Sequence, residues 1–289
     1  MKKRNIAASI ALAGSLLVTA CGNGAPTTTS GTSGGSTSGS AEPTEVVVGV
    51  YGSKHELWDK IQENLKAENI EIKIVEFTDY NTPNKALADG DLDLNSFQHH
   101  IFFDDFNQKN NTDLVAIGDT FLSPIGLYSE KYAAPLEIQA GDQVAIPNDP
   151  TNLGRALRVL EAAELIKLKD PSNMAPTQED IAENTKNLEI LEVDAAQIPR
   201  NLQDVGAAII NTDIAVDAGF SPAKDAIFLE PVTEGSQPYH NLIAARAADA
   251  DNEVYKRIVS EYQSQAIGEL MLEIYDGAQF PVWEGFVTP

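Results

Sequence analysis

The sequence predicts an α/β fold of two lobes, with two mostly parallel sheets, flanking helices and a cleft between the lobes. Short β-branched apolar runs alternate with amphipathic stretches along the chain, a pattern typical of parallel sheets covered by helices. The chain has 289 residues. About 245 of them follow a polar N-terminal segment, which favours two lobes over one. Ligands of open parallel sheets bind beyond the carboxyl ends of the strands, so two facing lobes would hold a ligand between them.

Eight short segments are predicted as strands. Most are runs of buried character, rich in Val and Ile and bounded by turn residues, as strands covered on both faces are. Residues 70–77 instead alternate strictly between apolar and polar side chains, which indicates a strand with one buried face. The predicted strands are residues 46–50, 70–77, 114–117, 144–146, 188–193, 207–210, 227–229 and 242–244.

Five segments are predicted as helices. Ser53 and Glu56 have the spacing of a capping box, and the helix that they introduce carries an apolar stripe at 57, 61 and 65. Pro83 begins the next helix, and Gly90 ends it. The remaining helices are predicted at residues 151–165, 252–262 and 266–275.

The composition excludes several classes of protein. Hydrophobic residues make up 43% and charged residues 22% of the chain, so it is not generally disordered. The formal charge of −23 disfavours nucleic acid as a partner, because phosphate binding needs a basic face. The single cysteine rules out an intramolecular disulfide and a cysteine-rich metal site.

The N-terminus has the pattern of an export signal. Three cations at residues 2–4 precede an apolar stretch at 6–18 that is too short to span a bilayer. The signal ends in Val-Thr-Ala-Cys, which resembles a bacterial lipobox. We therefore expect residues 1–20 to be a lipoprotein signal peptide and Cys21 to receive the lipid. An ordinary secretory signal that happens to end in cysteine is the alternative.

A flexible tether is predicted after the lipid attachment site. Residues 21–44 comprise Cys21 and a segment in which 17 of 23 residues are Gly, Ser or Thr. Such a segment buries too little apolar surface to fold, and its reach is about 25–30 Å. An exported, tethered and bilobal protein suggests a solute receptor that serves a membrane transporter, an inference from class rather than from a site.

The sequence PNDPTNLGR at residues 147–155 is the most informative site candidate. It follows a predicted strand and enters a helix, whose first turn offers free N–H groups and the positive end of the dipole. Arg155 lies one turn into this helix and could hold a planar carboxylate by two hydrogen bonds. The alternative, equally weighted, is that Arg155 pairs with an acidic neighbour of this acidic protein.

Two adjacent histidines and a group of aromatic residues form a second candidate. His99 and His100 could indicate zinc, but neighbours in a strand point to opposite faces and few other imidazoles are present. We favour one packed histidine in an aromatic cluster with Tyr80, Phe97 and Phe102, which would suit an apolar ligand side chain. A metal receptor that uses both histidines remains an alternative.

The other polar motifs are weaker. Asn211 and Asn241 stand at strand edges, where an amide could contact an ammonium and a carboxylate, although asparagine there is commonly a turn former. Ser221 and Lys224 have Ser-x-x-Lys spacing, which leaves an anchored hydrolase as a less favoured alternative. Nucleotide-binding loops, nucleophile elbows and zinc-protease motifs are absent from the sequence, so we expect no enzyme activity.

Eight ordered stretches together with the lipobox make the chain similar to the methionine-binding, NlpA-type lipoproteins of ABC importers. They run in order from the first predicted helices to near the C-terminus, and long strings such as PNDPTNLGR are highly specific. The matching stretches are Phe77–Leu87, Gly90–Asp93, Asn95–His99, Val144–Arg155, Leu165–Leu168, Ile210–Thr212, Ser221–Asp225 and Pro238–Ile243.

The resemblance implies a type II periplasmic-binding-protein-like fold whose cleft holds methionine or a close relative. By this resemblance, Arg155 would bind the α-carboxylate, and Asn211 and Asn241 would hold the α-amino and carboxylate groups. The side-chain pocket would be lined by Tyr80, Phe97, His99 and Phe102. The chain departs from the family where Ile101 and Phe102 replace the usual Pro and Tyr, so a pocket hydroxyl is lost.

The same resemblance implies domains, partners and location. We expect residues 45–126 and 238–289 to form lobe 1 and residues 127–237 to form lobe 2. The ligand would be L-methionine, a related amino acid or a methionine-containing dipeptide, with no cofactor. The macromolecular partners would be the permease and ATPase subunits of an ABC importer, and a lipid on Cys21 would hold the protein on the extracytoplasmic face of the cell membrane.

Overall fold

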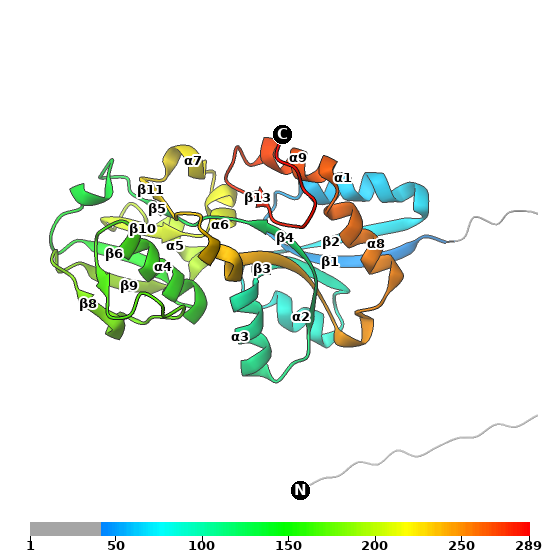
Figure 1. Cartoon of the computed structure of the whole chain (residues 1–289), viewed down its shortest axis with the longest axis horizontal. Helices are drawn as coiled ribbons and strands as arrows, with labels where there is room; N and C mark the ends of the chain where they lie inside the picture. The colour runs from blue at the N-terminus through cyan, green and yellow to red at the C-terminus, as the bar shows by residue number, and fades with distance from the viewer. Residues whose placement is uncertain (1–41) are drawn as a thin grey trace, which may run out of the picture. The chain divides into compact units, whose positions relative to one another are not determined.

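The computed structural model describes residues 42–289. They fold into two main sheets, each with helices on both faces (Figure 1). The predicted signal peptide, Cys21 and most of the predicted tether lie outside these residues. The first sheet has the order β13-β4-β12-β3-β1-β2. Its strands are β1 (Thr44–Tyr51), β2 (Ile70–Phe77), β3 (Leu94–His99), β4 (Val115–Leu122), β12 (His240–Ala245) and β13 (Phe280–Pro281).

The second sheet has the order β11-β5-β10-β6-β9. It is built from one continuous stretch of the chain, whereas the first sheet takes strands from before and after that stretch. A short antiparallel pair, β7 (Lys167–Leu168) with β8 (Ile181–Glu183), lies outside both sheets. The strands of the second sheet are β5 (Gly126–Tyr128), β6 (Gln143–Pro147), β9 (Glu189–Val193), β10 (Ala207–Ile210) and β11 (Phe228–Leu229).

Both sheets mix parallel and antiparallel pairs, so the prediction of mostly parallel sheets is wrong in this detail. Strands joined through helices are parallel, as in β1 with β2 and β6 with β9. The chain passes between the sheets twice, from β4 to β5 and from β11 to β12. The strand that follows each passage, β5 or β12, pairs antiparallel with its neighbours. A parallel neighbour needs a helical crossover in the same sheet, which these passages lack.

Helices cover both faces of each sheet, and a separate apolar cluster fills each interface. On the first sheet, α1, α8 and α9 pack on one face, and α2 and α3 on the other. On the second sheet, α4 packs on one face, and α5 and α6 on the other. The helices are α1 (Glu56–Leu65), α2 (Pro83–Asp89), α3 (His100–Asn110), α4 (Pro150–Ala162), α5 (Ile198–Asn201), α6 (Thr212–Asp217), α7 (Pro222–Asp225), α8 (Glu253–Tyr262) and α9 (Gln265–Ile274).

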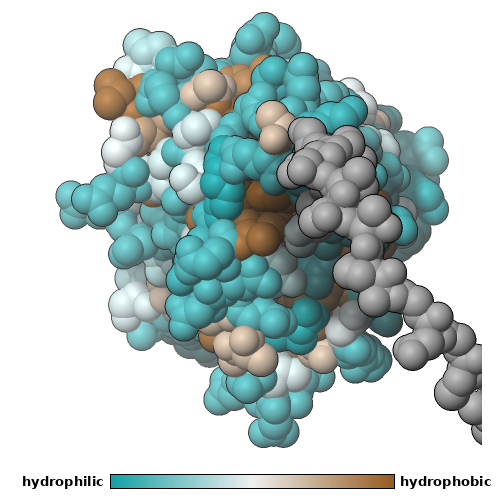
Figure 2. Space-filling model, turned by 90° about the vertical axis from the view of Figure 1, so that its right-hand side faces the viewer, coloured by the Kyte–Doolittle hydropathy of each residue, from teal (hydrophilic) through white to brown (hydrophobic). Residues whose placement is uncertain are grey.

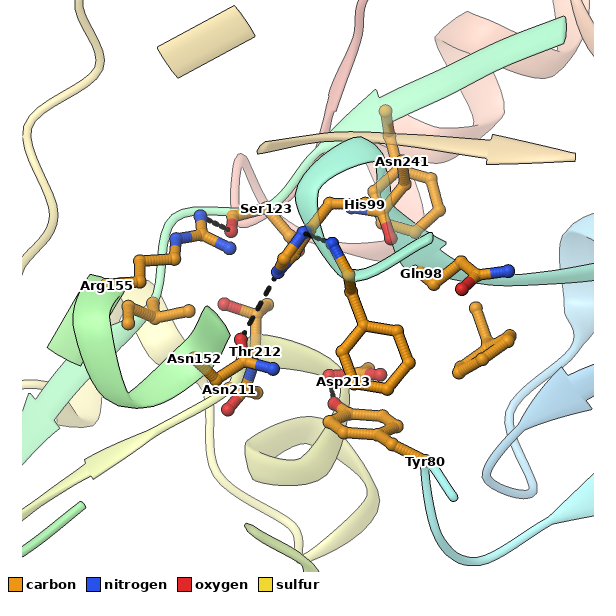
Figure 3. Close-up of a pocket in the computed structure, with 14 residues that line it drawn as sticks. Tyr80, Gln98, His99, Ser123, Asn152, Arg155, Asn211, Thr212, Asp213 and Asn241 are labelled. Carbon is orange, nitrogen blue, oxygen red and sulfur yellow. Dashed lines mark hydrogen bonds between the residues drawn. The ribbon is translucent and has the colours of Figure 1, made fainter. Parts of the chain in front are cut away.

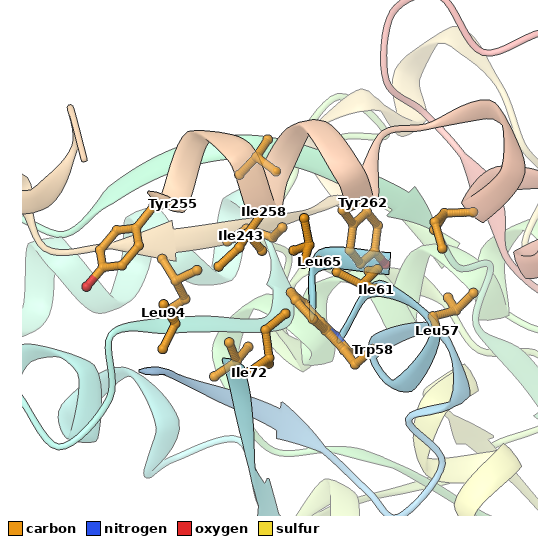
Figure 4. Close-up of a cluster of buried hydrophobic side chains, with 14 of the residues drawn as sticks. Leu57, Trp58, Ile61, Leu65, Ile72, Leu94, Ile243, Tyr255, Ile258 and Tyr262 are labelled. Atoms are coloured by element: carbon orange, nitrogen blue, oxygen red, sulfur yellow. The ribbon is translucent and has the colours of Figure 1, made fainter. Parts of the chain in front are cut away.

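The largest cluster lies between the first sheet and α1, α8 and α9 (Figure 4). Ile61 and Leu65 on α1 and Ile258 on α8 are fully buried there, with Trp58 and Tyr262 in tilted ring contact at 5.3 Å. The apolar stripe predicted at 57, 61 and 65 is the face that α1 buries. Burial of each large aliphatic side chain contributes about 1.5–3 kcal/mol to folding.

The predicted capping box at the start of α1 does not form. His55 occupies the N-cap position and makes no side-chain cap. Ser53 instead donates from its hydroxyl to Asp217 Oδ1 at 2.9 Å, a contact with a residue 164 positions away. By contrast, α2 begins at Pro83 and ends at Gly90, as predicted, and Gly90 has a φ of 87° that favours glycine.

The described surface is mostly hydrophilic where Figure 2 shows it, with hydrophobic residues in small areas only. Four large apolar side chains in residues 42–289 are exposed, namely Leu136, Val232, Phe280 and Val287. Within the same range, no helix combines the length and apolar character that a membrane crossing needs.

Ile61→Ala should lower the free energy of unfolding by about 2–5 kcal/mol, because it leaves a cavity in the largest cluster. The measurement is urea-induced unfolding followed by circular dichroism. Leu136→Ala is the matched control, because Leu136 is 61% exposed; its effect should stay within about 0.5 kcal/mol. Equal effects of the two substitutions would contradict the assigned core.

Candidate functional site

A cavity with about 400 Å³ of empty space, part of it open to solvent, lies where strands of both sheets end (Figure 3). β3 and β12 bring residues to it from the first sheet. The first turns of α4 and α6, which follow β6 and β10, bring residues from the second sheet. Its lining residues are Tyr80, Phe97, Gln98, His99, Phe102, Phe121, Ser123, Ile125, Asn152, Arg155, Asn211, Thr212, Asp213 and Asn241.

The structure brings all seven residues of the predicted site to this one cavity. Their roles toward a ligand stay a prediction. Asn152 and Thr212 lie beside predicted residues in the same sequence stretches and could have been found from those motifs. Gln98 likewise lies between two predicted residues, whereas Ser123 and Asp213 carried no signal of their own, because only the folded chain places them beside the cavity.

Arg155 is held by a carboxylate of the protein itself. The guanidinium is 2% exposed, and its Nε donates to Glu230 Oε1 at 3.0 Å. Nη2 donates to Glu230 Oε2 at 2.5 Å and to the carbonyl oxygen of Ser123 at 2.8 Å. The pair of hydrogen bonds that the sequence suggested for a ligand carboxylate is therefore made with Glu230. This is the pairing with an acidic neighbour that we gave as the alternative.

The remaining terminal nitrogen of Arg155, Nη1, is left for a ligand. It points toward the middle of the cavity (Figure 3) and donates no hydrogen bond to any residue of 42–289. The guanidinium carbon lies 4.3 Å from the centre of the Tyr239 ring, a cation–π contact that fixes its plane. Arg155 thus presents one charged donor in a fixed direction.

Three neutral side chains, those of His99, Asn152 and Asn211, form a hydrogen-bond network in the cavity wall next to Arg155. The backbone N–H of Phe102 donates to His99 Nδ1 at 3.2 Å, so the imidazole proton is on Nε2, 3.3 Å from Asn152 Oδ1. Asn152 Oδ1 also accepts from Asn211 Nδ2 at 2.8 Å, while Asn152 Nδ2 donates to Asp149. This network fixes the orientation of every amide in it.

The network leaves one acceptor without a partner. Asn211 Oδ1 is buried and accepts no hydrogen bond within the described residues. A buried acceptor in this state costs free energy, which a donor from a ligand would recover. The unpartnered acceptor of Asn211 and the free Nη1 donor of Arg155 belong to residues that line the same cavity, and together they match the two charged groups of an α-amino acid.

Ionisation in the cavity is set by burial. Burial and the nearby Arg155 cation lower the pKa of His99 to about 3, so its imidazole is neutral at physiological pH. Burial raises the pKa of Asp213 to about 6, against the hydrogen bond from the Tyr80 hydroxyl, which is 2.6 Å from Asp213 Oδ1. Above that pH, Asp213 carries a negative charge at the edge of the cavity.

Aromatic rings form the apolar wall. Tyr80 and Phe97 lie 6.0 Å apart between ring centres, and Phe102 meets them edge-on at 6.2 and 5.9 Å. Such a wall suits a polarisable thioether or an aliphatic chain. Phe102 completes it with a ring edge rather than a hydroxyl.

Gln98 is fixed in the cavity wall by a buried network of three amides. Its amide oxygen accepts from Asn84 Nδ2 at 2.6 Å, and its Nε2 donates to Asn84 Oδ1 and to Asn95 Oδ1. Asn84 and Asn95 are fully buried and Gln98 is 3% exposed. The network satisfies these polar groups without charge and holds β3 against α2.

The metal and hydrolase alternatives gain no support from the geometry. His100 points away from His99 and contacts Asp119 Oδ1 at 2.7 Å. Residues 42–289 contain no group of three or more His, Cys, Asp or Glu side chains arranged to hold a metal ion. Lys224 pairs with Asp276 at 2.8 Å rather than with Ser221, the residue before α7.

Comparison with known proteins places the chain in a family. The NlpA lipoprotein family profile matches residues 46–283. The D-methionine-binding lipoprotein MetQ of Escherichia coli is 39% identical over 286 residues, which cover 98% of this chain and 99% of that protein. The probable D-methionine-binding lipoprotein MetQ of Pasteurella multocida is 45% identical over 215 residues, which cover 74% and 77% of the two chains.

Solved structures agree with these sequence relationships. A nutrient-binding protein from Burkholderia cenocepacia bound to methionine superposes with a TM-score of 0.78 at 42% identity, covering 82% of this chain and 100% of that one. The substrate-binding protein of a methionine transporter from Streptococcus pneumoniae gives 0.79 at 39%, covering 83% and 96%. The predicted bilobal α/β fold is confirmed, and the chain belongs to the NlpA lipoprotein family.

Proposed function

We propose that this protein captures methionine, or a close derivative, outside the cytoplasm and delivers it to an ABC importer, without performing chemistry. The observation that carries the proposal is the cavity itself, whose lining combines aromatic rings with Arg155, which has one free guanidinium nitrogen, and Asn211, which has one unpartnered amide oxygen. Relatives named for methionine binding and a neighbour bound to methionine support the choice of ligand.

Each part of methionine finds a matching group. The α-carboxylate binds Nη1 of Arg155, and the α-ammonium donates to Asn211 Oδ1, while Asn241 contacts either group from β12. The thioether lies among the rings of Tyr80 and Phe97, with Phe102 and His99 closing the pocket. All of these contacts are short-range and directional, so they select by shape and hydrogen bonding.

The two lobes close around the ligand. Lobe 1 comprises residues 45–126 and 238–289, and lobe 2 comprises residues 127–237. The composition of the two sheets supports these boundaries, because the chain passes between the sheets near residues 122–126 and 229–240. The cavity takes residues from both sides, so a bound amino acid bridges the lobes and favours the closed arrangement.

A lipid on Cys21 holds the protein at the membrane, and residues 22–44 let the binding domain reach its transporter. Relatives named as lipoproteins support the anchor. The permease and ATPase subunits of the importer are the macromolecular partners. The formal charge of −23 disfavours direct adhesion to anionic headgroups, so attachment depends on the lipid.

Methionine should bind the full-length protein, purified in detergent and stripped of ligand by unfolding and refolding, with one-to-one stoichiometry in calorimetry. Asn211→Leu should weaken binding by about 10- to 100-fold, because a hydrogen bond to the ammonium is lost. Asn110→Leu on the exposed end of α3 is the control and should bind as the wild type does. A heat-silent wild type would contradict the ligand, and an unchanged Asn211→Leu affinity would contradict the role of Asn211.

Arg155→Ala is a poor probe of the same site. It removes the partner of the buried Glu230 carboxylate, and breaking a buried pair in this way costs about 3–5 kcal/mol. Loss of binding in this variant would therefore mix a lost contact with a damaged fold.

Cys21→Ala should move the protein from the membrane fraction to the soluble fraction of cells, because no lipid can then be attached. Immunoblotting of fractionated cells measures the change. Replacement of a tether residue, Ser30→Ala, is the control and should leave the protein in the membrane pellet. A Cys21→Ala protein that stays in the pellet would contradict the lipid attachment.

A further inference from the structure

Glu230 lies on the second passage between the sheets, in the segment that joins β11 to the 3₁₀ turn Glu234–Tyr239. Its side chain is 14% exposed. Besides Nε and Nη2 of Arg155, it accepts a hydrogen bond from the backbone N–H of Ile125 at 3.2 Å, and Ile125 belongs to the first passage. Glu230 does not line the cavity; it contacts Arg155 from behind.

The pairing decides which N–H groups a ligand can reach. A guanidinium has five N–H donors. Nε and both protons of Nη2 are directed at Glu230 and at the carbonyl oxygen of Ser123. A ligand is left with Nη1 alone, so Glu230 positions Arg155 and restricts its use.

The pairing also sets the charge of the cavity. Glu230 cancels the charge of Arg155, and His99 is neutral because burial lowers its pKa. Asp213 adds a carboxylate at the cavity edge, and Asp149 adds another behind Asn152. Arg158 adds a second cation near Tyr239, outside the cavity lining, but the three carboxylates of Glu230, Asp213 and Asp149 still outnumber the two guanidinium groups, so the local balance is negative.

We propose that Glu230 is a specificity-determining residue, which neutralises Arg155 so that the cavity accepts zwitterionic amino acids and rejects simple carboxylates of the same shape. The inference rests on the proposed function and extends it to the class of ligand. A carboxylate without an ammonium brings a net negative charge into a cavity that has no uncompensated cation for it. A zwitterion brings none, and its ammonium reaches Asn211 Oδ1 and the field of Asp213.

Removal of the charge on Glu230 should reverse this preference. In Glu230→Gln the side chain keeps its size and one acceptor oxygen, while Arg155 becomes an uncompensated buried cation. A ligand carboxylate then becomes its only counter-charge, whether or not the ligand carries an ammonium. The gain is therefore larger for the anionic ligand than for the zwitterion.

The test compares two ligands on full-length protein in detergent by calorimetry. One is L-methionine, and the other is its deaminated analogue, in which hydrogen replaces the α-amino group. The wild type should prefer methionine, and Glu230→Gln should reduce the ratio of the two affinities by about tenfold or more. Glu183→Gln, which removes the carboxylate from an exposed pair with Lys167 at 3.1 Å, is the matched control and should leave the ratio unchanged.

Glu230→Asp separates charge from geometry. It shortens the side chain but keeps the negative charge, so it should keep a ratio close to that of the wild type. If Glu230→Gln does not fold, as judged by circular dichroism, Glu230→Asp carries the test, and a tenfold loss of preference in it would overturn the proposal.

The outcomes distinguish this inference from the proposed function. A wild type that binds neither ligand contradicts methionine binding itself. A wild type that prefers methionine, together with a folded Glu230→Gln protein that loses affinity for both ligands by the same factor, overturns the specificity role alone. That result would reduce Glu230 to a residue that only supports the fold.

Discussion

The ion pair between Arg155 and Glu230 is the constraint on which the site depends. An arginine that is 2% exposed must have its charge compensated and most of its N–H groups satisfied, and here Nη1 alone donates no hydrogen bond within residues 42–289. Glu230 supplies the charge, the Ser123 carbonyl supplies a further acceptor, and the Tyr239 ring supports the guanidinium face. These partners come from the two passages between the sheets, so the binding site and the connection between the lobes share the same residues.

That sharing gives the proposed closing motion a physical basis. In this proposal, a rotation of one sheet against the other would bend the two passages, and residues of the passages hold Arg155, the one guanidinium that lines the cavity within residues 42–289. A ligand carboxylate bound to Nη1 would connect α4 to the opposite wall of the cavity. The hydrogen bonds of Arg155 to Glu230 and Ser123 would remain in place. Under the proposed function, ligand binding and lobe closure would be coupled through contacts of a few ångströms, and no longer pathway would be required.

The sequence was most informative where the signal is local. Strand 70–77 matches the structure residue for residue, and the helix begins at Pro83 and stops before Gly90 as predicted, because alternation, proline and glycine act on the residues beside them. The site residues came together because most of them lie near the end of a strand or the beginning of a helix, at the edges where the two sheets face the cavity. The mixed pairing of both sheets was missed because it depends on where the chain passes between them.

Glu230 could not have been found in this way. It lies 75 residues from Arg155, in a segment without regular structure, and it is one of 43 acidic residues. The capping box failed for a similar reason, since Ser53 found a better acceptor in Asp217, which only the folded chain brings near. Local spacing offers candidates for a contact, whereas the arrangement of the folded chain decides among them.

The acidic surface and the neutralised cation act over different distances. A formal charge of −23 lowers the concentration of anions near the protein, but physiological salt screens this field within about 8 Å. Inside the cavity that screening is weak, and a single uncompensated guanidinium would attract any carboxylate that entered. Glu230 neutralises Arg155 and so removes this attraction inside the cavity, which the screened surface charge does not reach. In the proposed mechanism, recognition then depends on whether a ligand offers both a carboxylate for Nη1 and a donor for Asn211, a requirement that α-amino acids meet and simple acids do not.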